Sequence, residues 1–594
     1  MSFRANVRFR SAPVAACFLA AAAAPILADL SIPRPSFGVP EFAEPGGAFR
    51  VEVRADAGLD SDRWTAVLAN DLRAWTGTVE RAEYGLFVDN DTAVGYRLTV
   101  RAPPDIPPET FRLAVAHPDA GAATNGNAVG VVPDFEEDFY VLHYTDLQAG
   151  GYEPTKPETG QCGKNGSIRE IYWHAPAIAL IHPRFLLDTG DELDDPYYAY
   201  SATNYRQYAE ALSQAGVPVL ATRGDNDDMV SAEEWRSAIG IETCSVALGS
   251  FVVFQKDYNE DHFTAWFTNA YAASFADPAV GFRLFGQHYV DGGASWLPQA
   301  GQEPGLMLVG DIHMNAVLQA APYPIVATEA AHLKGATALV EFTRTGTAWS
   351  CPTLADVPAA QFRLMESGAV ARVSSTFAVP NDGSAVSNAA TIVNRIPLRF
   401  RFGRLRFQMP FAAAGYDVSN GTVLAQYDYD AGSHLAVLVQ VDIAADATTE
   451  VAIRPSSAAP AAHGTPVWWL IRHGLPPNSA GENYDEGDGI PAWQEYVADT
   501  DPVDPESVFR ITGAGLPPSG SLEFDSSTSR WYRVLVCSNL PDGVWSDVPG
   551  LAARPGAGGP DAFPVSNPVP YLTYRLAVAP PGRIGRFRKQ RSLK

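Results

Sequence analysis

Five short apolar runs of this 594-residue chain each end in an acidic residue or a histidine. A run of this kind is typical of a buried strand, and open α/β sheets hold their chemistry in the loops just beyond the strand C-termini. The polar residues that close the five runs are Asp146, Asp191, Asp225, His288 and His313. We therefore expect five loops to converge on one site of an α/β unit.

Around these residues the chain carries an ordered set of short motifs. They are Asp146-Leu147-Gln148, Gly190-Asp191-Glu192-Leu193-Asp194, Gly224-Asp225-Asn226-Asp227, His288, and Gly310-Asp311-Ile312-His313. The set resembles the motifs of the calcineurin-like metallophosphoesterase superfamily, which are D-x-H, G-D-x-x-D, G-N-H-D/E, a lone His and G-H-x-H. The resemblance covers about a third of the chain. It implies a multidomain protein in which a calcineurin-like α/β sandwich is flanked by all-β domains of the β-sandwich type.

The resemblance also implies a dinuclear site, in which two metal ions about 4 Å apart hold the hydroxide that attacks phosphorus. The metal ligands that it implies are Asp146, Gln148, Asp191, Asp225, His288, Asp311 and His313. Asp191 corresponds to the carboxylate that bridges both ions. Asp194 corresponds to a residue that orients ligands, and Arg223 could either pair with neighbouring carboxylates or clamp a phosphate.

Three of the ligand positions differ from the family pattern in one direction. Gln148 and Asp311 stand where the family has histidine, and Asp225 stands where it has asparagine. Oxygen ligands favour hard ions, whereas imidazole suits zinc and iron. We therefore expect two divalent metal ions, with Mn²⁺ or Mg²⁺ preferred to iron or zinc.

The fourth departure is Asn226, which occupies the position of the histidine that protonates the leaving group in the family. General acid catalysis is typically worth ~10²–10⁴-fold in rate, and an amide cannot shuttle a proton. Asp227 is one group that could take over this role. Two functions stay open: a phosphoesterase acting on a phosphomonoester or phosphodiester, and a binding module that keeps the fold but has lost catalysis.

The N-terminus predicts export. Arg4, Arg8 and Arg10 precede a short alanine-rich apolar stretch, so we interpret residues 1–28 as a secretory signal peptide and expect a secreted, periplasmic or cell-surface protein. No later segment offers the ~20 apolar residues that a membrane span needs. A net charge of -24 argues against nucleic acid as a partner, despite the basic tail at 583–594.

The rest of the chain divides by composition into further units. Short alternating runs broken by Pro, Gly and Asn predict an N-terminal β-sandwich at 29–134, ahead of the catalytic unit at 135–347. A β-rich domain is expected at 348–454, followed by a linker at 455–466. The segment 511–582 is expected to form a small β-sandwich, suited to contact with a cell surface or polysaccharide.

Residues 467–510 resemble the thrombospondin type 3-like or dockerin-like calcium segments of secreted proteins. On an EF-hand-type loop that starts at Tyr484, the residues in ligand positions are Glu486, Asp488, Ile490 through its carbonyl, and Glu495. Tyr484 stands where the family has aspartate. Calcium binding and a merely acidic helix-turn-helix therefore both stay open.

Four cysteines follow the signal-like segment: Cys162, Cys244, Cys351 and Cys537. Their spacing is not that of a metal site. Cys162 and Cys244 form the one pair within the catalytic unit, where a disulfide is compatible with export.

Overall fold

The computed structural model describes residues 30–580 except 87–93, 151–165, 194–200, 259–264, 289–300, 356–359, 368, 431, 459–460, 516–519, 538–543, 549–550, 552 and 566–572. The signal-like segment, the basic tail, Asp194 and Cys162 therefore lie outside the described residues. The predicted pairing of Cys162 with Cys244 stays a prediction. Among the described residues, none of the helices combines the length and hydropathy that crossing a bilayer requires.

The N-terminal unit is built from eight strands and contains the short helix η1 (Ser61–Arg63). The strands are β1 (Ser31–Arg34), β2 (Glu41–Ala43), β3 (Ala48–Arg54), β4 (Thr65–Ala69), β5 (Ala74–Leu86), β6 (Val94–Arg101), β7 (Thr110–His117) and β8 (Gly121–Val131), in the order β1-β3-β6-β5-β4-β7-β8-β2. The first residues of β5 pair with β4 and the later ones with β6, so this strand joins two halves of the unit. Alternate side chains such as Val51, Leu68 and Leu98 point inward and form one core.

The first sheet of the catalytic unit has the order β13-β12-β9-β20-β21. Its strands are β9 (Phe139–Tyr144), β12 (Leu186–Asp188), β13 (Val219–Ala221), β20 (Ala336–Thr345) and β21 (Ala348–Ser350). The strands β9, β12 and β13 are parallel, and β20 runs antiparallel to β9. A further strand, β22 (Gln361–Arg363), pairs with β20, so this sheet extends beyond the boundary expected at residue 347.

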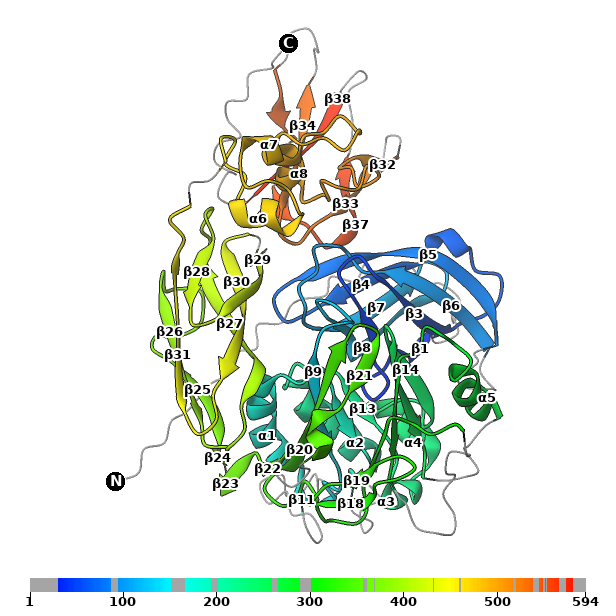
Figure 1. The fold of residues 1–594 in the computed structure, drawn as a ribbon. Coiled ribbons are helices and arrows are strands. Elements are labelled where there is room, and N and C mark those ends of the chain that lie inside the picture. The colour runs from blue at the N-terminus through cyan, green and yellow to red at the C-terminus, as the bar shows by residue number, and fades with distance from the viewer. Residues whose placement is uncertain are drawn as a thin grey trace.

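The second sheet has the order β14-β15-β16-β17-β19-β18. Its strands are β14 (Cys244–Leu248), β15 (Phe251–Lys256), β16 (Phe282–Gln287), β17 (Leu306–Val309), β18 (Ala316–Gln319) and β19 (Ile325–Ala327). Apolar side chains of the two sheets share one core, for example Leu187 with Leu284 and Leu308. The strands are buried on both faces because helices cover the outer sides (Figure 1).

The helices of this unit are α1 (Ile168–Ile181), α2 (Ser201–Ser213), α3 (Asp225–Asp228), α4 (Ala232–Ala238) and α5 (Ala265–Ser274). The helices α1, α2 and α4 bury Ile178, Tyr208 and Trp235 against the first sheet. The helix α5 buries Phe267 and Tyr271 against the second sheet. Two short strands, β10 (Ala149–Gly150) and β11 (Gly166–Ser167), and the helix η5 (Pro352–Ala355) complete the unit.

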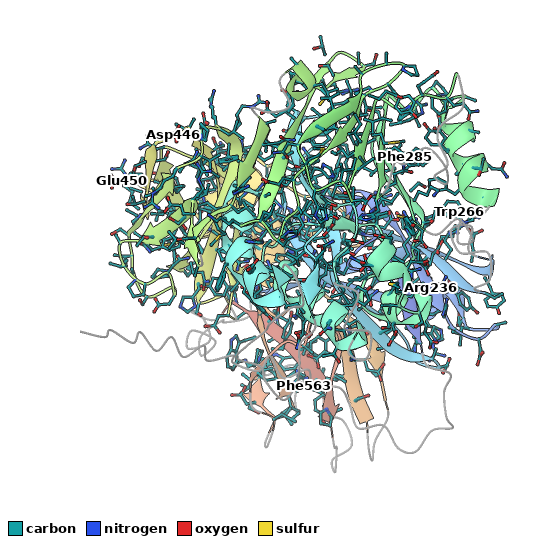
Figure 2. All side chains as sticks on the ribbon, turned by 90° about the horizontal axis from the view of Figure 1, so that it is seen from below. Arg236, Trp266, Phe285, Asp446, Glu450 and Phe563 are labelled. Atoms are coloured by element: carbon teal, nitrogen blue, oxygen red, sulfur yellow. The ribbon has the colours of Figure 1, made fainter. Side chains whose placement is uncertain are left out.

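The β-rich domain is a pair of sheets. One has the order β25 (Val373–Phe377), β26 (Asn388–Asn394), β31 (Thr448–Pro455), β28 (Tyr416–Ser419), and the other β27 (Phe400–Pro410), β30 (His434–Ile443), β29 (Thr422–Tyr429). A hairpin of β23 (Met365–Ser367) and β24 (Val370–Ala371) precedes them. The helix α1 contacts β25 and β27, so the β-rich domain shares a core with the helical side of the catalytic unit. Asp446 and Glu450 mark its outer edge, opposite Trp266 on α5 (Figure 2).

The C-terminal part starts with three short helices, α6 (Val467–Arg472), α7 (Ser479–Glu482) and α8 (Ala492–Ala498). Trp468 and Trp469 of α6 lie in the core shared with the β-rich domain. The small C-terminal unit follows, with β32 (Ile511–Ala514), β33 (Gly520–Ser526), β34 (Trp531–Cys537), β35 (Ser546–Asp547), β36 (Arg554–Pro555), β37 (Gly559–Val565) and β38 (Thr573–Ala579). Its strands form two sheets around a core of their own.

Four buried charged residues form an ion network between distant parts of the chain. Arg530 donates to Asp428 at 2.8 Å and lies 3.0 Å from Asp499, and Arg73 donates to Asp499 at 2.8 Å and also to Asp428. Burial opposes ionisation of Asp499, but Arg530 and Arg73 outweigh it and hold the pKa of Asp499 well below its usual range. The network ties the N-terminal unit and the β-rich domain to the C-terminal part.

Candidate metal centre

The five loops predicted from the sequence come together at the edge of the two sheets. Asp146, Asp191 and Asp225 follow β9, β12 and β13, while His288 follows β16, and Asp311 and His313 follow β17. The strands are parallel within each sheet, so their C-terminal ends share an edge.

Two sets of three side chains have ligand atoms within 4.8 Å of one another. The first set is Asp146, Asp191 and His288, all of them buried, and the second is Asp225, His288 and Asp311, which is more exposed. His288 belongs to both sets. Two adjacent groups of oxygen and nitrogen donors that share a member are suited to hold two cations side by side.

His288 presents one ring nitrogen to the site because the other is fixed. Its Nδ1 lies 2.7 Å from the carbonyl oxygen of Thr189, which can only accept, so Nδ1 carries the proton. Its Nε2 then faces Asp225 Oδ1 at 3.2 Å and Asp191 Oδ1 at 3.3 Å. Burial by itself would lower the pKa of His288, but Asp191 and Asp225 raise it to about 10. A positive charge is thus favoured where the carboxylates meet.

The remaining predicted ligands join the same cluster through hydrogen bonds. His313 Nε2 lies 3.1 Å from Asp146 Oδ1, and Gln148 Nε2 donates to Asp191 Oδ2 at 3.3 Å. Asp146 Oδ2 accepts from the hydroxyl of Thr145 at 2.7 Å and from the backbone N–H of Asp311 at 3.0 Å. The structure therefore brings all seven predicted ligands into one connected group.

The backbone of these loops is strained where the ligands sit. Five of the predicted ligands have positive φ angles: Asp146 (52°), Gln148 (47°), Asp191 (58°), Asp311 (72°) and His313 (52°). A non-glycine residue in this region is uncommon, and residues held in such sparsely populated conformations cost of order 1–3 kcal/mol each. Gly224 shows how tightly the loops fit, because a Cβ there would collide with the Asp191 carboxylate. Strain concentrated on one set of polar side chains supports a functional role for the set.

Asn226 contacts the carboxylate that the resemblance assigns as the bridge. Its Nδ2 donates to Asp191 Oδ2 at 2.8 Å, and its backbone N–H donates to Asp191 Oδ1 at 3.0 Å. Both oxygens of Asp191 are therefore oriented by residue 226. The side chain of Asn226 fixes a ligand, whichever way it also faces a substrate.

Asp227 was expected as a group that could replace the missing proton donor, and its geometry does not support that role. Its side chain is fully buried and accepts from the backbone N–H groups of Asp191 at 2.9 Å and Gly224 at 3.0 Å. It also accepts from the backbone of Glu192 and Leu193 and from the hydroxyl of Tyr205. A carboxylate whose oxygens are all engaged by donors positions the loops around it.

Replacing Asp227 with asparagine should destabilise the protein by about 2–4 kcal/mol, since an amide puts N–H groups against backbone N–H groups and hydrogen bonds to charged acceptors are worth about 1.5–3 kcal/mol. Thermal unfolding and urea unfolding of the full chain measure this change. As a control, Asp277→Asn alters an exposed aspartate of the same unit and should leave the midpoint unchanged. Wild-type stability with selective loss of activity would instead give Asp227 a chemical role.

Arg223 is buried beneath the third loop. It lies 3.2 Å from Asp228 and 3.4 Å from Asp257, and it donates to the carbonyl oxygens of Asp227 and Val230 at 3.0 Å. This geometry matches the ion-pair alternative rather than a phosphate clamp. The other residue expected to orient ligands, Asp194, lies outside the described residues.

Two residues near the site were missed in the sequence. His332 Nδ1 lies 3.0 Å from the carbonyl oxygen of Asp146, and its ring packs against His313 at 5.4 Å between centroids. Tyr258 packs edge-on against His288 at 6.3 Å. The apolar run that ends in the turn before His332 was a signal of the same kind as the other five.

A second acidic cluster lies in the loop between α7 and α8. Ligand atoms of Asp485, Glu486 and Asp488 lie within 4.8 Å of one another. Among the described residues, neither oxygen of Glu486 nor Oε2 of the buried Glu495 has a hydrogen-bond partner or contact with solvent. Burial, and then the nearby Glu486, raise the pKa of Glu495 to about 8. The predicted calcium ligand Ile490 lies in this loop, where its N–H donates to Asp488.

No protein family model and no curated protein matches the chain. Solved structures with local similarity include a purple acid phosphatase from yellow lupin (Lupinus luteus), with 10% identity over 52% of this chain and 70% of that one, at a TM-score of 0.30. A predicted phosphoesterase from Streptococcus pneumoniae has 10% identity over 36% of this chain and 97% of its own, at 0.18. A Vps29 mutant from Entamoeba histolytica has 12% identity over 36% and 96%, at 0.17. At these TM-scores the likenesses carry no argument about this chain.

Proposed function

We propose that the chain is an exported, metal-dependent phosphoesterase whose two-sheet unit is a calcineurin-like metallophosphoesterase. The observation that carries the proposal is the pair of donor sets that share His288 and lie on either side of Asp191. In the proposed reaction water forms a new P–O bond, the ester P–O bond breaks, and the alcohol leaves with a proton. The substrate is a phosphomonoester or a phosphodiester.

The donor set fits divalent cations. Burial, with the carboxylates of Asp227, Asp225 and Asp146, raises the pKa of Asp191 well above its usual range, although His288 opposes this. A carboxylate in such surroundings is costly to ionise unless a cation is added. Since most of the donors are oxygen atoms, the set supports Mn²⁺ or Mg²⁺ rather than zinc or iron.

Asp146, Gln148 and His313 would hold one ion, Asp225, His288 and Asp311 the other, and Asp191 both. Bound ions supply Lewis-acid stabilisation of the phosphate oxygens and a nucleophile at neutral pH. The chain itself orients the ligands. Thr145 holds Asp146, the carbonyl of Thr189 holds His288, and Asn226 holds Asp191.

Hydrolysis of p-nitrophenyl phosphate with Mn²⁺ or Mg²⁺ tests the proposal, because this ester leaves without protonation. An alkyl phosphate should react far more slowly, since Asn226 cannot donate a proton. We expect Asn226→His to raise turnover of the alkyl phosphate ~10-fold or more and to change turnover of p-nitrophenyl phosphate little. Equal gains on both esters would show that residue 226 acts through Asp191 instead.

The alternative function is a binding module on the same fold, with the C-terminal units directed at a cell surface or polysaccharide. The amide of Asn226 in place of a proton donor favours this alternative. Absence of hydrolysis of either ester with every divalent ion tried, before and after the Asn226→His change, would select it.

We also propose that the loop between α7 and α8 binds Ca²⁺. The unpartnered carboxylate oxygens of Glu486 and Glu495 support this assignment, because buried carboxylates without donors are disfavoured in the absence of a cation. Asp501 adds to the negative charge on both residues, which offsets the absence of an acid at Tyr484.

Millimolar Ca²⁺ should therefore raise the thermal midpoint of the full chain, and Glu495→Gln should abolish the rise. A ligand at 100 times its Kd adds about 2.7 kcal/mol to stability. The measurement uses an Asp191→Ala background, so that ions at the metal centre do not contribute. Glu506→Gln, which changes an exposed acid nearby, should keep the full shift. An unchanged shift in Glu495→Gln would refute the assignment.

A further inference from the structure

Exposed apolar side chains gather on the loops that carry the metal centre. Six of them form what we call the apolar rim: Met229, Tyr258, Met314, Val317, Leu318 and Leu333. Met229 is 60% exposed and Met314 is 52% exposed. In the described part of the catalytic unit, the other large apolar side chains with comparable exposure are Tyr172 and Trp173 on α1. Single exposed apolar residues are normal on a protein surface, but a group of them around one site indicates a ligand.

Each part of the rim is attached to a different element of the metal centre. Met314 directly follows His313, and Leu333 directly follows His332, whose ring packs on His313. Met229 ends α3, where its N–H donates to the carbonyl of Asn226 at 3.3 Å.

The remaining members complete the rim. Tyr258 packs on His288, and its N–H donates to the carbonyl of Arg223. Val317 and Leu318 lie on β18, the edge strand that follows Met314. The rim is thus continuous in the chain with the loops of Asp225, His288 and His313, and Asp225 and His313 are the ligands with exposed side chains.

The chemistry of the rim selects among phosphoesters. A sugar or a nucleoside needs several hydrogen-bond partners beside the phosphate, and Tyr258 alone among the six rim side chains carries a hydrogen-bonding group of ordinary strength. A hydrocarbon needs only apolar surface, and each methylene removed from water is worth about 0.8 kcal/mol. Methionine side chains adapt well to a flexible chain.

We propose that the substrate is a phosphoester whose ester group is a long alkyl chain, held by the apolar rim while the metal centre holds the phosphate. This inference rests on the proposed phosphoesterase function and names its substrate class. The alkyl chain lies over Met229, Met314 and Leu333 as it leaves the metal centre. The rim therefore discriminates by chain length, whereas the metal ligands contact the phosphate that all such substrates share.

A series from ethyl to octyl phosphate, kept below micelle-forming concentrations, tests the proposal. The leaving alcohols are chemically alike, so differences in rate report on binding of the chain. We expect kcat/KM to rise about twofold per methylene, less than the ~4-fold of full burial, and at least about tenfold over the series. A flat or falling series would overturn the proposal.

Variants of the rim locate the effect. The double change Met229→Gln with Met314→Gln keeps side-chain length and should bring the octyl-to-ethyl ratio of kcat/KM close to one. Ile471→Gln is the matched control, because Ile471 on α6 is 60% exposed and lies in a different part of the chain. An undiminished ratio in the double variant would overturn the proposal.

Binding of alkylphosphonates, which cannot be hydrolysed at the P–C bond, separates this inference from the proposed function. Calorimetric titration in the presence of Mn²⁺ should show octylphosphonate binding at least about tenfold more tightly than ethylphosphonate. If no ester is hydrolysed but this difference is found, the phosphoesterase function fails and the alkyl specificity stands. Equal affinities would overturn the alkyl specificity even if p-nitrophenyl phosphate is hydrolysed.

Discussion

Replacing Asp191 with alanine should remove tight metal binding and lower hydrolysis of p-nitrophenyl phosphate by more than about 100-fold. Loss of an outer hydrogen-bond partner of a metal ligand already costs ~10–100-fold, and Asp191 lies between both donor sets. Metal content per chain after purification gives a second readout that does not depend on turnover.

The matched control for this change is Asp277→Ala, which removes an exposed aspartate of the same unit. It should keep both the metal content and the rate. Wild-type metal content and activity in the Asp191→Ala protein would remove Asp191 from the site and with it the assignment of the two ions.

Replacing Arg530 with alanine should cost about 3–5 kcal/mol, because it leaves two buried carboxylates, Asp428 and Asp499, to share Arg73. Urea unfolding of the full chain followed by tryptophan fluorescence measures this loss. Limited proteolysis should show release of the C-terminal part before global unfolding. Arg399→Ala breaks an exposed pair with Asp442 and should change the midpoint little.

The acid side of the same experiment has a defined sign. The pKa of Asp499 is depressed in the folded protein, so its contribution is present above the unfolded value of about 3.9 and is lost as the pH falls through the lower folded value. Without Arg530 that folded pKa moves up. Acid unfolding of the Arg530→Ala protein should therefore begin at a higher pH than that of the wild type, and an unchanged acid midpoint would contradict the role of the network.

The convergence of Asp146, Asp191, Asp225, His288 and His313 could be predicted from the sequence. Each follows a short apolar run, and apolar runs of four to eight residues are a local property of the chain that the sheet then preserves. Parallel strands place their C-terminal ends at one edge, so strand order along the chain was enough to gather the residues. The β-rich character of the flanking units follows from the same kind of local pattern.

The roles of individual polar residues were decided only by the tertiary structure. Asp227 and Asn226 are neighbours in one motif, yet one accepts five hydrogen bonds in the interior and the other orients Asp191. Which donors meet a carboxylate depends on how strained loops pack, and spacing along the chain does not encode that packing. His332 reaches the site for the same reason, through a turn that contacts the Asp146 loop.

Long-range partners show the limit most clearly. Arg73 and Arg530 are separated by most of the chain, and their shared bonds to Asp428 and Asp499 exist only because three units pack together. Nothing near Arg73 in the sequence distinguishes it from an exposed arginine. Hydrophobic periodicity is a local signal and determined the strands, whereas charge pairing across units depends on the complete fold and was determined by it alone.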